Sequence, residues 1–582
     1  MSPGLISLLI FAPLVSILLI LFLPERFKNW YKYISLATAL VILFLSIVLT
    51  LNFSNSGKKL AGINNISEFQ YVEKVDWIGL KLGNLGKISI DYFIGIDGLS
   101  ISMVLLSGLV LVLAVLASWN EEKSLKGYHI LFLILCSSII GCFVALDFFL
   151  FYLFFELLLL PMYFLIGMWG GPRREYASIK FFLYTLAGSL LILLVMIALC
   201  FSVIDPAETA VNMGLAKETS LATPEVVAKV QQLLKQSAIG QDKLVHTFNM
   251  IYMMDQANYI PDSILHSLSG MTLCGHSMRL IAFLALIIGF IIKLPSVPFH
   301  TWLPDAHVEA PTAISVILAA ILLKVGAYGI LRVPYSMFPE GGVYFASLIG
   351  WVGVVSIIYG AFNALAMRDI KKMIAYSSVS HMGFVLLGIA SMTPEGVNGS
   401  VFQMFSHGIL SALLFLLAGV IYDRTHDRNI DSYRGLASRM PYYTILVTIA
   451  FFASLGLPGF SGFIGELFVL LGAFNSSKFN GLLSKWQAAI AAIGILLGAV
   501  YYLWTLQKMF FGKFWTRKPH YWAKMTDLTH REFLVLLPLV ALTIILGLYP
   551  GLLFDLISPA VAKLVDVVLV NGKQNLSQIK LQ

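Results

Sequence analysis

Runs of apolar residues long enough to cross a bilayer recur along almost the whole chain. An α-helix needs about 20 apolar residues to span the hydrocarbon core of a membrane, and about fourteen such runs can be placed. Hydrophobic residues make up 58% of the chain and charged residues only 12%, a composition that soluble globular domains do not have. The sequence therefore predicts an all-α polytopic membrane protein. The predicted spans are residues 3–23, 31–52, 92–118, 128–147, 148–168, 177–203, 280–303, 312–333, 342–365, 374–391, 400–421, 441–471, 485–510 and 532–555.

Lysine and arginine cluster in every second loop between these spans, and this sets the predicted orientation. Basic loops stay on the cytoplasmic side of a membrane, so we expect both termini on the periplasmic side of a bacterial inner membrane. The run from Leu5 to Leu23 lacks a basic n-region and a cleavage site, which favours a first helix over a signal peptide. The net charge of +8 follows from these loops, so the expected contacts are with lipid and not with nucleic acid.

Proline and glycine interrupt the seventh and twelfth predicted spans. Pro295 and Pro298 break one, and Pro458 and Gly459 break the other. Proline removes a backbone donor, and freed backbone groups at membrane depth are tolerated only inside protein or beside a wet cavity. Broken helices at matching places in two halves are typical of transporters built from inverted repeats. We therefore expect two inverted five-helix repeats, with discontinuous seventh and twelfth helices.

This pattern divides the chain into four parts. Residues 1–127 hold helices 1–3 with an outer loop at 53–90, and residues 128–333 hold the first repeat with an outer insertion at 204–279. Residues 334–511 hold the second repeat, and residues 512–582 hold helix 14 and a C-terminal tail. Within the insertion, Thr223 as N-cap and Pro224 at the first position predict an amphipathic helix that packs on the protein surface or at the membrane interface.

Four ionisable side chains lie deep inside predicted spans: Glu156, Lys293, Lys324 and Glu466. A charge at the centre of a bilayer costs roughly 2.5–3.5 kcal/mol on insertion scales, so four together cost on the order of 10 kcal/mol. Such residues usually mark an ion or proton pathway. A structural salt bridge between Glu156 and Lys293 is the main alternative, although a Glu–Lys pair can also tune a proton carrier because each partner shifts the pKa of the other.

Three histidines lie between these charges along the chain: His300, His381 and His407. A single histidine on an apolar face is commonly a core residue, but neutral imidazole can both accept and donate a proton. With the serines and tyrosines beside them, the three predict a hydrated relay. His307 and Asp305 either gate entry to this relay or cap a loop. The remaining histidines are expected on the solvated surface: His129, His246, His266, His276, His426, His520 and His530.

No cofactor motif appears in the chain. The four cysteines, Cys136, Cys142, Cys200 and Cys274, form no CxxC or Cys/His cluster and are predicted to be small apolar residues or unpaired thiols. Walker A, dinucleotide, haem and iron–sulfur patterns are also missing from the sequence. The chain is therefore expected to bind no metal and no redox cofactor.

Several of these residues carry a resemblance to a known family. The run from Phe154 to Tyr163, the run His300–His307 and the stretch around Lys324 resemble the antiporter-like subunits of respiratory complex I, a superfamily that also includes subunits of multi-subunit Na⁺/H⁺ antiporters. Glu466 resembles the subunit M (chain 4) branch, because the other branches typically carry lysine there. The 204–279 insertion is longer than expected for the family.

The resemblance implies proton translocation driven by NADH oxidation elsewhere in a complex. Glu156 and Lys293 would be the coupled pair, Lys324 the central carrier, and Glu466 the terminal site toward the outlet, with the three histidines as the bridging relay. FMN, iron–sulfur clusters and quinone would belong to partner subunits, and the antiporter-like subunits L and N would be neighbours. Two alternatives stay open: a cation/proton antiporter subunit, and a scaffold that does not pump.

Overall fold

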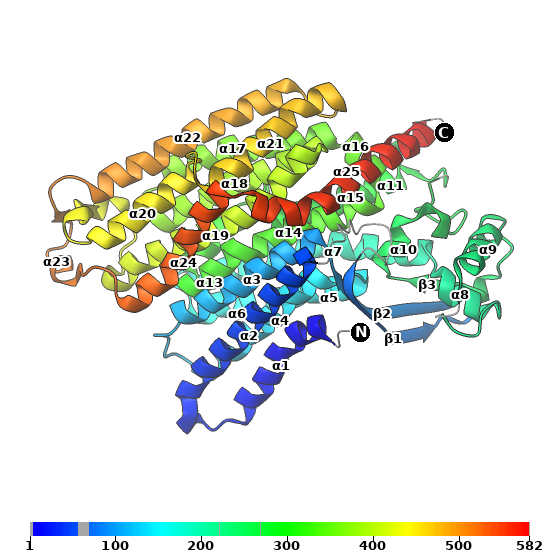
Figure 1. Cartoon of the computed structure of the whole chain (residues 1–582), viewed down its shortest axis with the longest axis horizontal. Helices are drawn as coiled ribbons and strands as arrows, with labels where there is room; N and C mark the ends of the chain where they lie inside the picture. Colours follow the sequence, from blue (N-terminus) through cyan, green and yellow to red (C-terminus); the bar gives the residue numbers. More distant parts are fainter. Residues whose placement is uncertain (1–3, 56–68, 220–221, 268, 581–582) are drawn as a thin grey trace.

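The computed structural model describes residues 4–55, 69–219, 222–267 and 269–580, and most of them lie in helices that run side by side in one bundle (Figure 1). Twelve helices of this part of the chain are long and apolar enough to cross a membrane. The two predicted spans outside that set are the interrupted ones. The polytopic helical class is therefore confirmed, while the count of fourteen stays a prediction.

Three helices precede the first repeat: α1 (Leu5–Phe22), α2 (Lys28–Asn55) and α3 (Gly98–Ala117). The first five-helix unit then follows, with its fourth span split between α11 and α12. It comprises α4 (Leu125–Val144), α5 (Phe148–Leu157), α6 (Leu159–Trp169), α7 (Arg174–Ser202), α11 (Met278–Lys293), α12 (Trp302–Glu309), α13 (Thr312–Ile317), a π-helical turn (Leu318–Leu322) and α14 (Leu323–Arg332).

Two short helices, α15 (Pro334–Met337) and α16 (Pro339–Tyr344), lead into the second unit. Its fourth span is also split, between α20 and α21, as the sequence predicts. The unit comprises α17 (Ala346–Ala366), α18 (Ile370–Ser391), α19 (Pro394–Thr425), α20 (Pro441–Ser454), α21 (Ser461–Phe479) and α22 (Lys485–Phe510). The last helices are α23 (Tyr521–Lys524), α24 (His530–Leu548) and α25 (Gly551–Lys580).

Both breaks fall where proline or glycine ends the helix. α11 ends at Lys293, directly before Leu294 and Pro295, and α12 begins only at Trp302. α20 ends at Ser454, and Gly456 and Gly459 in the gap adopt positive φ angles. A positive φ angle is sterically unfavourable for residues with a Cβ, which glycine lacks. These two glycines therefore permit the chain to turn between the two half-helices.

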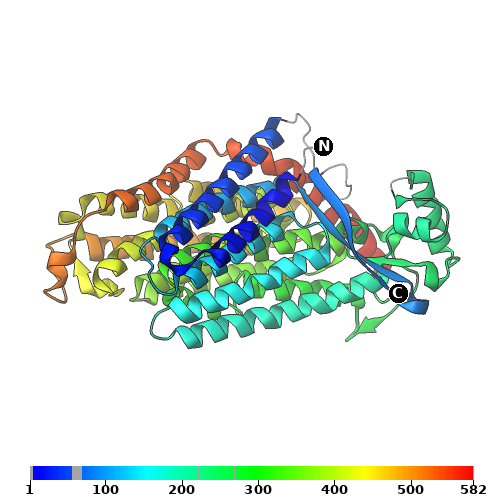
Figure 2. The same ribbon diagram turned by 90° about the horizontal axis from the view of Figure 1, so that it is seen from below.

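The predicted outer segments gather at one end of the bundle, where α1 also begins and α25 ends (Figures 1 and 2). The described part of loop 53–90 is not a simple loop: β1 (Gln70–Lys81) pairs antiparallel with β2 (Lys87–Ile96). The insertion adds α8 (Pro206–Asn212), α9 (Pro224–Lys235), β3 (Val245–Thr247) and α10 (Met250–Met254), and β3 pairs parallel with β2. The predicted amphipathic helix is confirmed as α9, with Thr223 as its N-cap.

Two predicted boundaries are wrong. The third span begins at Gly98 and not at residue 92, because β2 extends to Ile96. The fourteenth span ends at Leu548, and most of the predicted tail is the 30-residue helix α25. Apolar residues of α25 such as Ile557, Val561 and Leu564 are fully buried, so this helix packs on the bundle.

Candidate functional site: a buried polar line from the first repeat into the second

Lys324 lies in the first turn of α14, completely buried. Its Nζ donates to the carbonyl oxygen of Ala319 at 2.7 Å and lies 2.6 Å from Nδ1 of His407. Ala319 belongs to the π-helical turn that precedes α14. Such single π turns are rare and often occur at functional sites, because the wider turn leaves a carbonyl available to a side chain. This local distortion therefore helps to hold the ammonium in the protein interior.

Glu466 lies in α21, just after the second break, and is 3% exposed. Its Oε1 is 3.0 Å from Nδ1 of His381 on α18. The ring of His381 lies 5.4 Å, centroid to centroid, from the ring of His407 on α19. The amide of Gln403 lies 3.4 Å from the same Nδ1 of His381. Four helices, α14, α19, α18 and α21, thus bring Lys324, His407, His381 and Glu466 into one line.

Glu156 and Lys293 form a second, separate group. Lys293 is 2% exposed, and its Nζ has no hydrogen-bond partner among the residues that the structure describes. The ammonium lies 4.6 Å from the centroid of the Phe155 ring, a cation–π contact. Oε1 of Glu156 is likewise buried without a hydrogen bond in this part of the chain. The carboxylate acts on Lys293 electrostatically, but the two make no direct ion pair.

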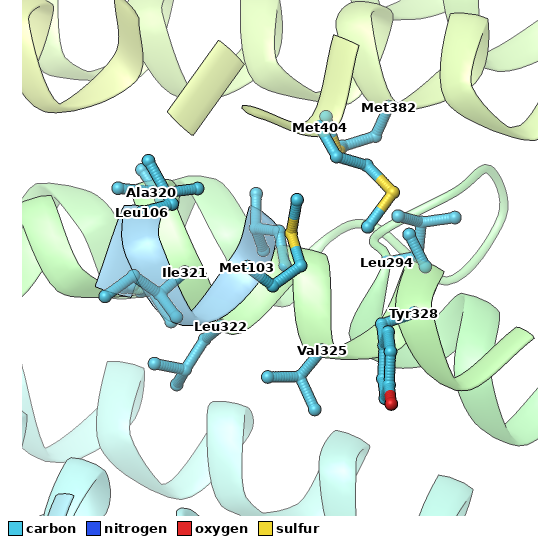
Figure 3. Packing of buried hydrophobic residues seen from close by; sticks show 14 of the residues in the cluster. Met103, Leu106, Leu294, Ala320, Ile321, Leu322, Val325, Tyr328, Met382 and Met404 are labelled. Carbon is cyan, nitrogen blue, oxygen red and sulfur yellow. The ribbon is translucent and has the colours of Figure 1, made fainter. Parts of the chain in front are cut away.

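Apolar side chains pack around α14. Leu294, Met382 and Met404 lie near one another, and Val325 points to another side of α14 (Figure 3). Gly326 brings the two groups' helices together, because a Cβ there would lie 2.9 Å from the backbone nitrogen of Leu294. Lys293 and Lys324 therefore lie on helices that meet in a close backbone contact.

His300 is buried but stands apart from the line. Both of its ring nitrogens lack a hydrogen-bond partner in the described ranges. Its ring packs edge-on against Tyr359, with centroids 5.1 Å apart, and lies 6.1 Å from Tyr376. The structure thus joins His381 and His407 to the central charges and does not join His300 to them by a hydrogen bond.

Several charged residues at helix ends are buried although the sequence patterns did not single them out. Arg332 donates to Asp97 at 2.6 Å, and Arg279 pairs with Glu340 at 2.5 Å, with all four side chains at most 2% exposed. Lys371, at the second position of α18, is 1% exposed. Apolar neighbours on both sides of Arg279 and Arg332 were the available signal. Linear sequence does not show whether a charge at a helix end faces water or protein.

Two histidines expected on the surface are buried. His129 is 1% exposed and His246 is 5% exposed. His129 lies within α4, further from the helix end than predicted, and His246 lies in β3, covered by the insertion. His307 is fully buried and stacks on Phe415 with centroids 4.4 Å apart, so it does not cap an exposed loop.

Acidic and basic side chains also gather where the hairpin meets the insertion. Asp76, Asp91 and Glu208 are close enough to offer three carboxylate ligands. Lys74 pairs with Asp91 at 3.0 Å, and Lys87 pairs with Glu208 at 2.8 Å. Because lysine already neutralises two of the three carboxylates, the cluster fits a structural network better than a metal centre.

A family model described as NADH:quinone oxidoreductase/Mrp antiporter, TM matches residues 145–211 and 228–498. NADH-quinone oxidoreductase subunit M of Rhodobacter capsulatus is 38% identical over 568 residues, covering 97% of this chain and 96% of the relative. NADH-ubiquinone oxidoreductase chain 4 of Marchantia polymorpha is 35% identical, covering 96% of this chain and 97% of the relative.

Solved structures agree on the fold. A chain of respiratory complex I from Thermus thermophilus with bound NADH matches with a TM-score of 0.71 and 27% identity, covering 97% of this chain and 99% of that one. A chain of the Mrp complex from a Dietzia species matches with a TM-score of 0.69 and 18% identity, covering 98% of this chain and all of that one. The second likeness shows the fold alone.

Proposed function

The chain belongs to the subunit M (chain 4) family of NADH-quinone oxidoreductase, and we propose that it carries protons across the membrane along Lys324, His407, His381 and Glu466. It is a subunit of a proton-translocating oxidoreductase and works with other subunits of that complex. The redox chemistry belongs to those partners: FMN, iron–sulfur clusters and quinone are proposed to lie outside this chain.

One observation carries the proposal: ionisable groups follow one another through the core at contact distance. Lys324 Nζ lies 2.6 Å from His407, and Glu466 lies 3.0 Å from His381. The two imidazole rings between them are 5.4 Å apart. Imidazole can accept a proton on one nitrogen while it releases one from the other. A single water between the rings would therefore complete a path from the ammonium to the carboxylate.

Glu156 and Lys293 are proposed as the coupled pair that controls this line. Lys293 is buried with no hydrogen bond from the described part of the chain, so the stability of its charge depends strongly on the distance to Glu156. A movement that separates the two would favour loss of the proton from Lys293. Gly326 places the helix that carries Lys324 directly against this region. Loss of the charge on Lys293 would therefore change the electrostatic potential at Lys324.

His300 is proposed as a relay residue between the pair and the line, reached through water and not by direct contact. It is 3% exposed, and both ring nitrogens lack partners among the residues described. A buried polar group of this kind is costly unless a water satisfies it. Its neighbours Tyr359 and Tyr376 add hydroxyl groups to which such waters could bond.

The membrane setting follows from the same proposal. The chain is a multi-pass membrane protein, and we place it in a bacterial inner membrane with both termini on the periplasmic side, because the basic loops alternate accordingly. The neighbours are proposed to be the antiporter-like subunits L and N. The two repeats, residues 128–333 and 334–511, are proposed as the units that move relative to one another during pumping.

A Na⁺/H⁺ antiporter subunit is the second candidate, because the matching family model also describes Mrp antiporters. Glu466 argues against it, since that branch typically carries lysine at this position. Purification of the chain from its native membrane decides between them. Co-purification with NADH–quinone activity supports the first reading, and a purified assembly without that activity supports the antiporter.

The path itself is tested with Glu466→Gln in the assembled complex. Loss of the titratable group should reduce the number of protons pumped per NADH, because the amide cannot be loaded and unloaded. Glu122→Gln is the matched control, since Glu122 is exposed. Unchanged pumping per NADH in an assembled Glu466→Gln complex would contradict a role for Glu466.

A further inference from the structure

A hollow of about 630 Å³ opens at the end of α22, away from the proposed proton path. Three cationic side chains line it, Arg434, Lys508 and Lys513, together with three aromatic ones, Trp504, Phe511 and Trp515. α22 is one of the helices long enough to cross a membrane and ends at Phe510. The hollow therefore lies at the membrane boundary, where the polar headgroups of lipids are found.

The local fold holds the walls of this hollow in place. Arg434 and Trp515 face each other in the short antiparallel pair β6 (Tyr433–Arg434) and β7 (Trp515–Thr516). The guanidinium lies 5.7 Å from the centroid of the Trp515 ring. Gly435 has a φ angle of +64°, and a Cβ there would lie 2.6 Å from the carbonyl oxygen of Gly512. Only glycine thus permits the two segments to approach so closely.

The charge in the hollow is only partly neutralised. Lys508 pairs with Asp431 and lies 4.4 Å from the centroid of the Trp504 ring. Among the residues described, no carboxylate forms an ion pair with Arg434 or Lys513. Both side chains are exposed. Three cations and one carboxylate leave an excess of positive charge that suits an anionic ligand.

An apolar stripe leads along α22 into the hollow. Its exposed side chains recur every three or four residues, which is the spacing of one helix face. The stripe comprises Ile493, Leu496, Val500, Leu503 and Trp504, and the hollow adds Phe511 just beyond the end of α22; each is at least 37% exposed. A free phosphate or a nucleotide would leave this stripe without a role, whereas an acyl chain would cover it.

We propose that this hollow binds the headgroup of an anionic phospholipid, with the phosphate between Arg434, Lys508 and Lys513 and an acyl chain on the exposed face of α22. Arginine and lysine bind phosphate through charge-assisted hydrogen bonds. Tryptophan at the membrane boundary favours the headgroup level. Basic pockets beside membrane helices on the cytoplasmic side bind anionic headgroups in this way.

The test uses the intact complex in nanodiscs that contain photoactivatable phosphatidylglycerol or, in parallel, photoactivatable phosphatidylcholine. We expect phosphatidylglycerol to label residues 493–515 and phosphatidylcholine to label them much less. The double variant Arg434→Gln/Lys513→Gln should reduce phosphatidylglycerol labelling about tenfold, because each cation near a headgroup contributes substantially to anionic lipid binding. Arg26→Gln is the matched control: Arg26 is also exposed and lies 4.8 Å from an aromatic ring, and its loss should leave labelling unchanged.

Three results would overturn the proposal. Equal labelling by the two lipids, or labelling that survives in the double variant, would show that the hollow does not select an anionic headgroup. Full competition by millimolar inorganic phosphate would mean a site for free phosphate. Absence of lipid labels together with zero-length cross-links between Lys513 and a carboxylate of another subunit would mean that a protein partner covers the hollow.

Discussion

At the residue scale, the buried charge of Lys324 depends on very few partners. Its ammonium contacts the Ala319 carbonyl and the imidazole of His407, and a buried ion with so little compensation is costly. His407 is 3% exposed and lies between Lys324 and His381. It accepts a hydrogen bond from the ammonium, and in the proposed path it is the first step toward Glu466.

His407→Leu should lower proton pumping per NADH in the assembled complex. Leucine fills a similar volume but can neither accept a hydrogen bond from Lys324 nor pass a proton to His381. Pumping is measured in sealed vesicles against NADH oxidation. His520→Leu serves as the control because His520 is exposed. Pumping equal to that of the control would show that the line does not run through His407.

Asp205 gives a residue-level prediction outside the membrane. Burial raises the pKa of this N-cap carboxyl of α8 to about 6, even though Lys74 acts in the opposite direction. The folded state therefore holds the proton more tightly than the unfolded chain does, whose pKa is about 3.9. The contribution of this proton to the free energy of unfolding is fully present below pH 4. It is lost as the pH rises through about 6, and the loss amounts to roughly 3 kcal/mol in all.

Asp205→Asn should remove this dependence, since asparagine is an equally good N-cap. We expect the variant to protect the amides of α8 from hydrogen exchange better than the native chain at pH 8, after correction for intrinsic exchange rates. At pH 5 the advantage should be smaller by about 1 kcal/mol. A difference between variant and native chain that is the same at both pH values would contradict the raised pKa.

Sequence alone identified the four central charges and two of the histidines that join them. It could do so because a charged residue in the middle of a long apolar run must lie within the predicted membrane span. It did not identify Arg279, Arg332 or Lys371 as buried, because these residues lie near helix ends. The hydrogen bond of Lys324 to the π-helical turn was also unpredictable, since nothing in the composition of 318–322 distinguishes a π turn from an α turn.

At the scale of elements, the contact between α11 and α14 determines where Lys293 and Lys324 lie relative to each other. Gly326 is its closest point: a Cβ there would lie 2.9 Å from the Leu294 nitrogen and 3.0 Å from the Phe290 carbonyl oxygen. These are backbone atoms, which cannot turn away as the end of a side chain can.

Gly326→Ala should therefore force the two helices apart, at a cost of about 1–3 kcal/mol, and reduce pumping. Gly127→Ala in α4 is the matched control, because the nearest atom to a Cβ there is 3.9 Å away. The measurements are thermal stability of the purified complex and protons pumped per NADH. Two variants with the same stability and pumping would show that the close contact is not required.

The elements were predictable to different degrees. Both helix breaks were predicted because proline and glycine act locally. The β1–β2 hairpin was missed, since β1 carries charged residues such as Glu73, Lys74 and Asp76 and lacks a clear alternation of polar and apolar positions. α25 was missed because its polar residues interrupt the apolar run, although its buried face contacts the bundle.

At the scale of the whole molecule, one buried ion pair connects the end of the insertion, the bundle and the C-terminal helix. Arg279 at the start of α11 pairs with Glu340 of α16, and it also donates to the carbonyl oxygens of Leu265 and Met337. Asn575 of α25 donates to the same Glu340 at 3.2 Å. Three distant segments thus share one charge pair.

Arg279→Met should destabilise the chain by about 3–5 kcal/mol, because Glu340 then remains as a buried carboxylate without its partner. The double variant Arg279→Met/Glu340→Gln should recover much of this loss. Thermal unfolding of the purified complex and limited proteolysis of residues 204–279 measure both effects. If the double variant is less stable than Arg279→Met, the pair does not act as a unit.

The central claim is that protons pass through Lys324, and the number of protons pumped per NADH oxidised by a complex that carries Lys324→Ala tests it most directly. The complex must be assembled to native levels, and Lys478→Ala, at an exposed lysine, is measured beside it. We expect a lower ratio for Lys324→Ala and an unchanged ratio for Lys478→Ala. A native ratio in an assembled Lys324→Ala complex would contradict proton transfer through Lys324.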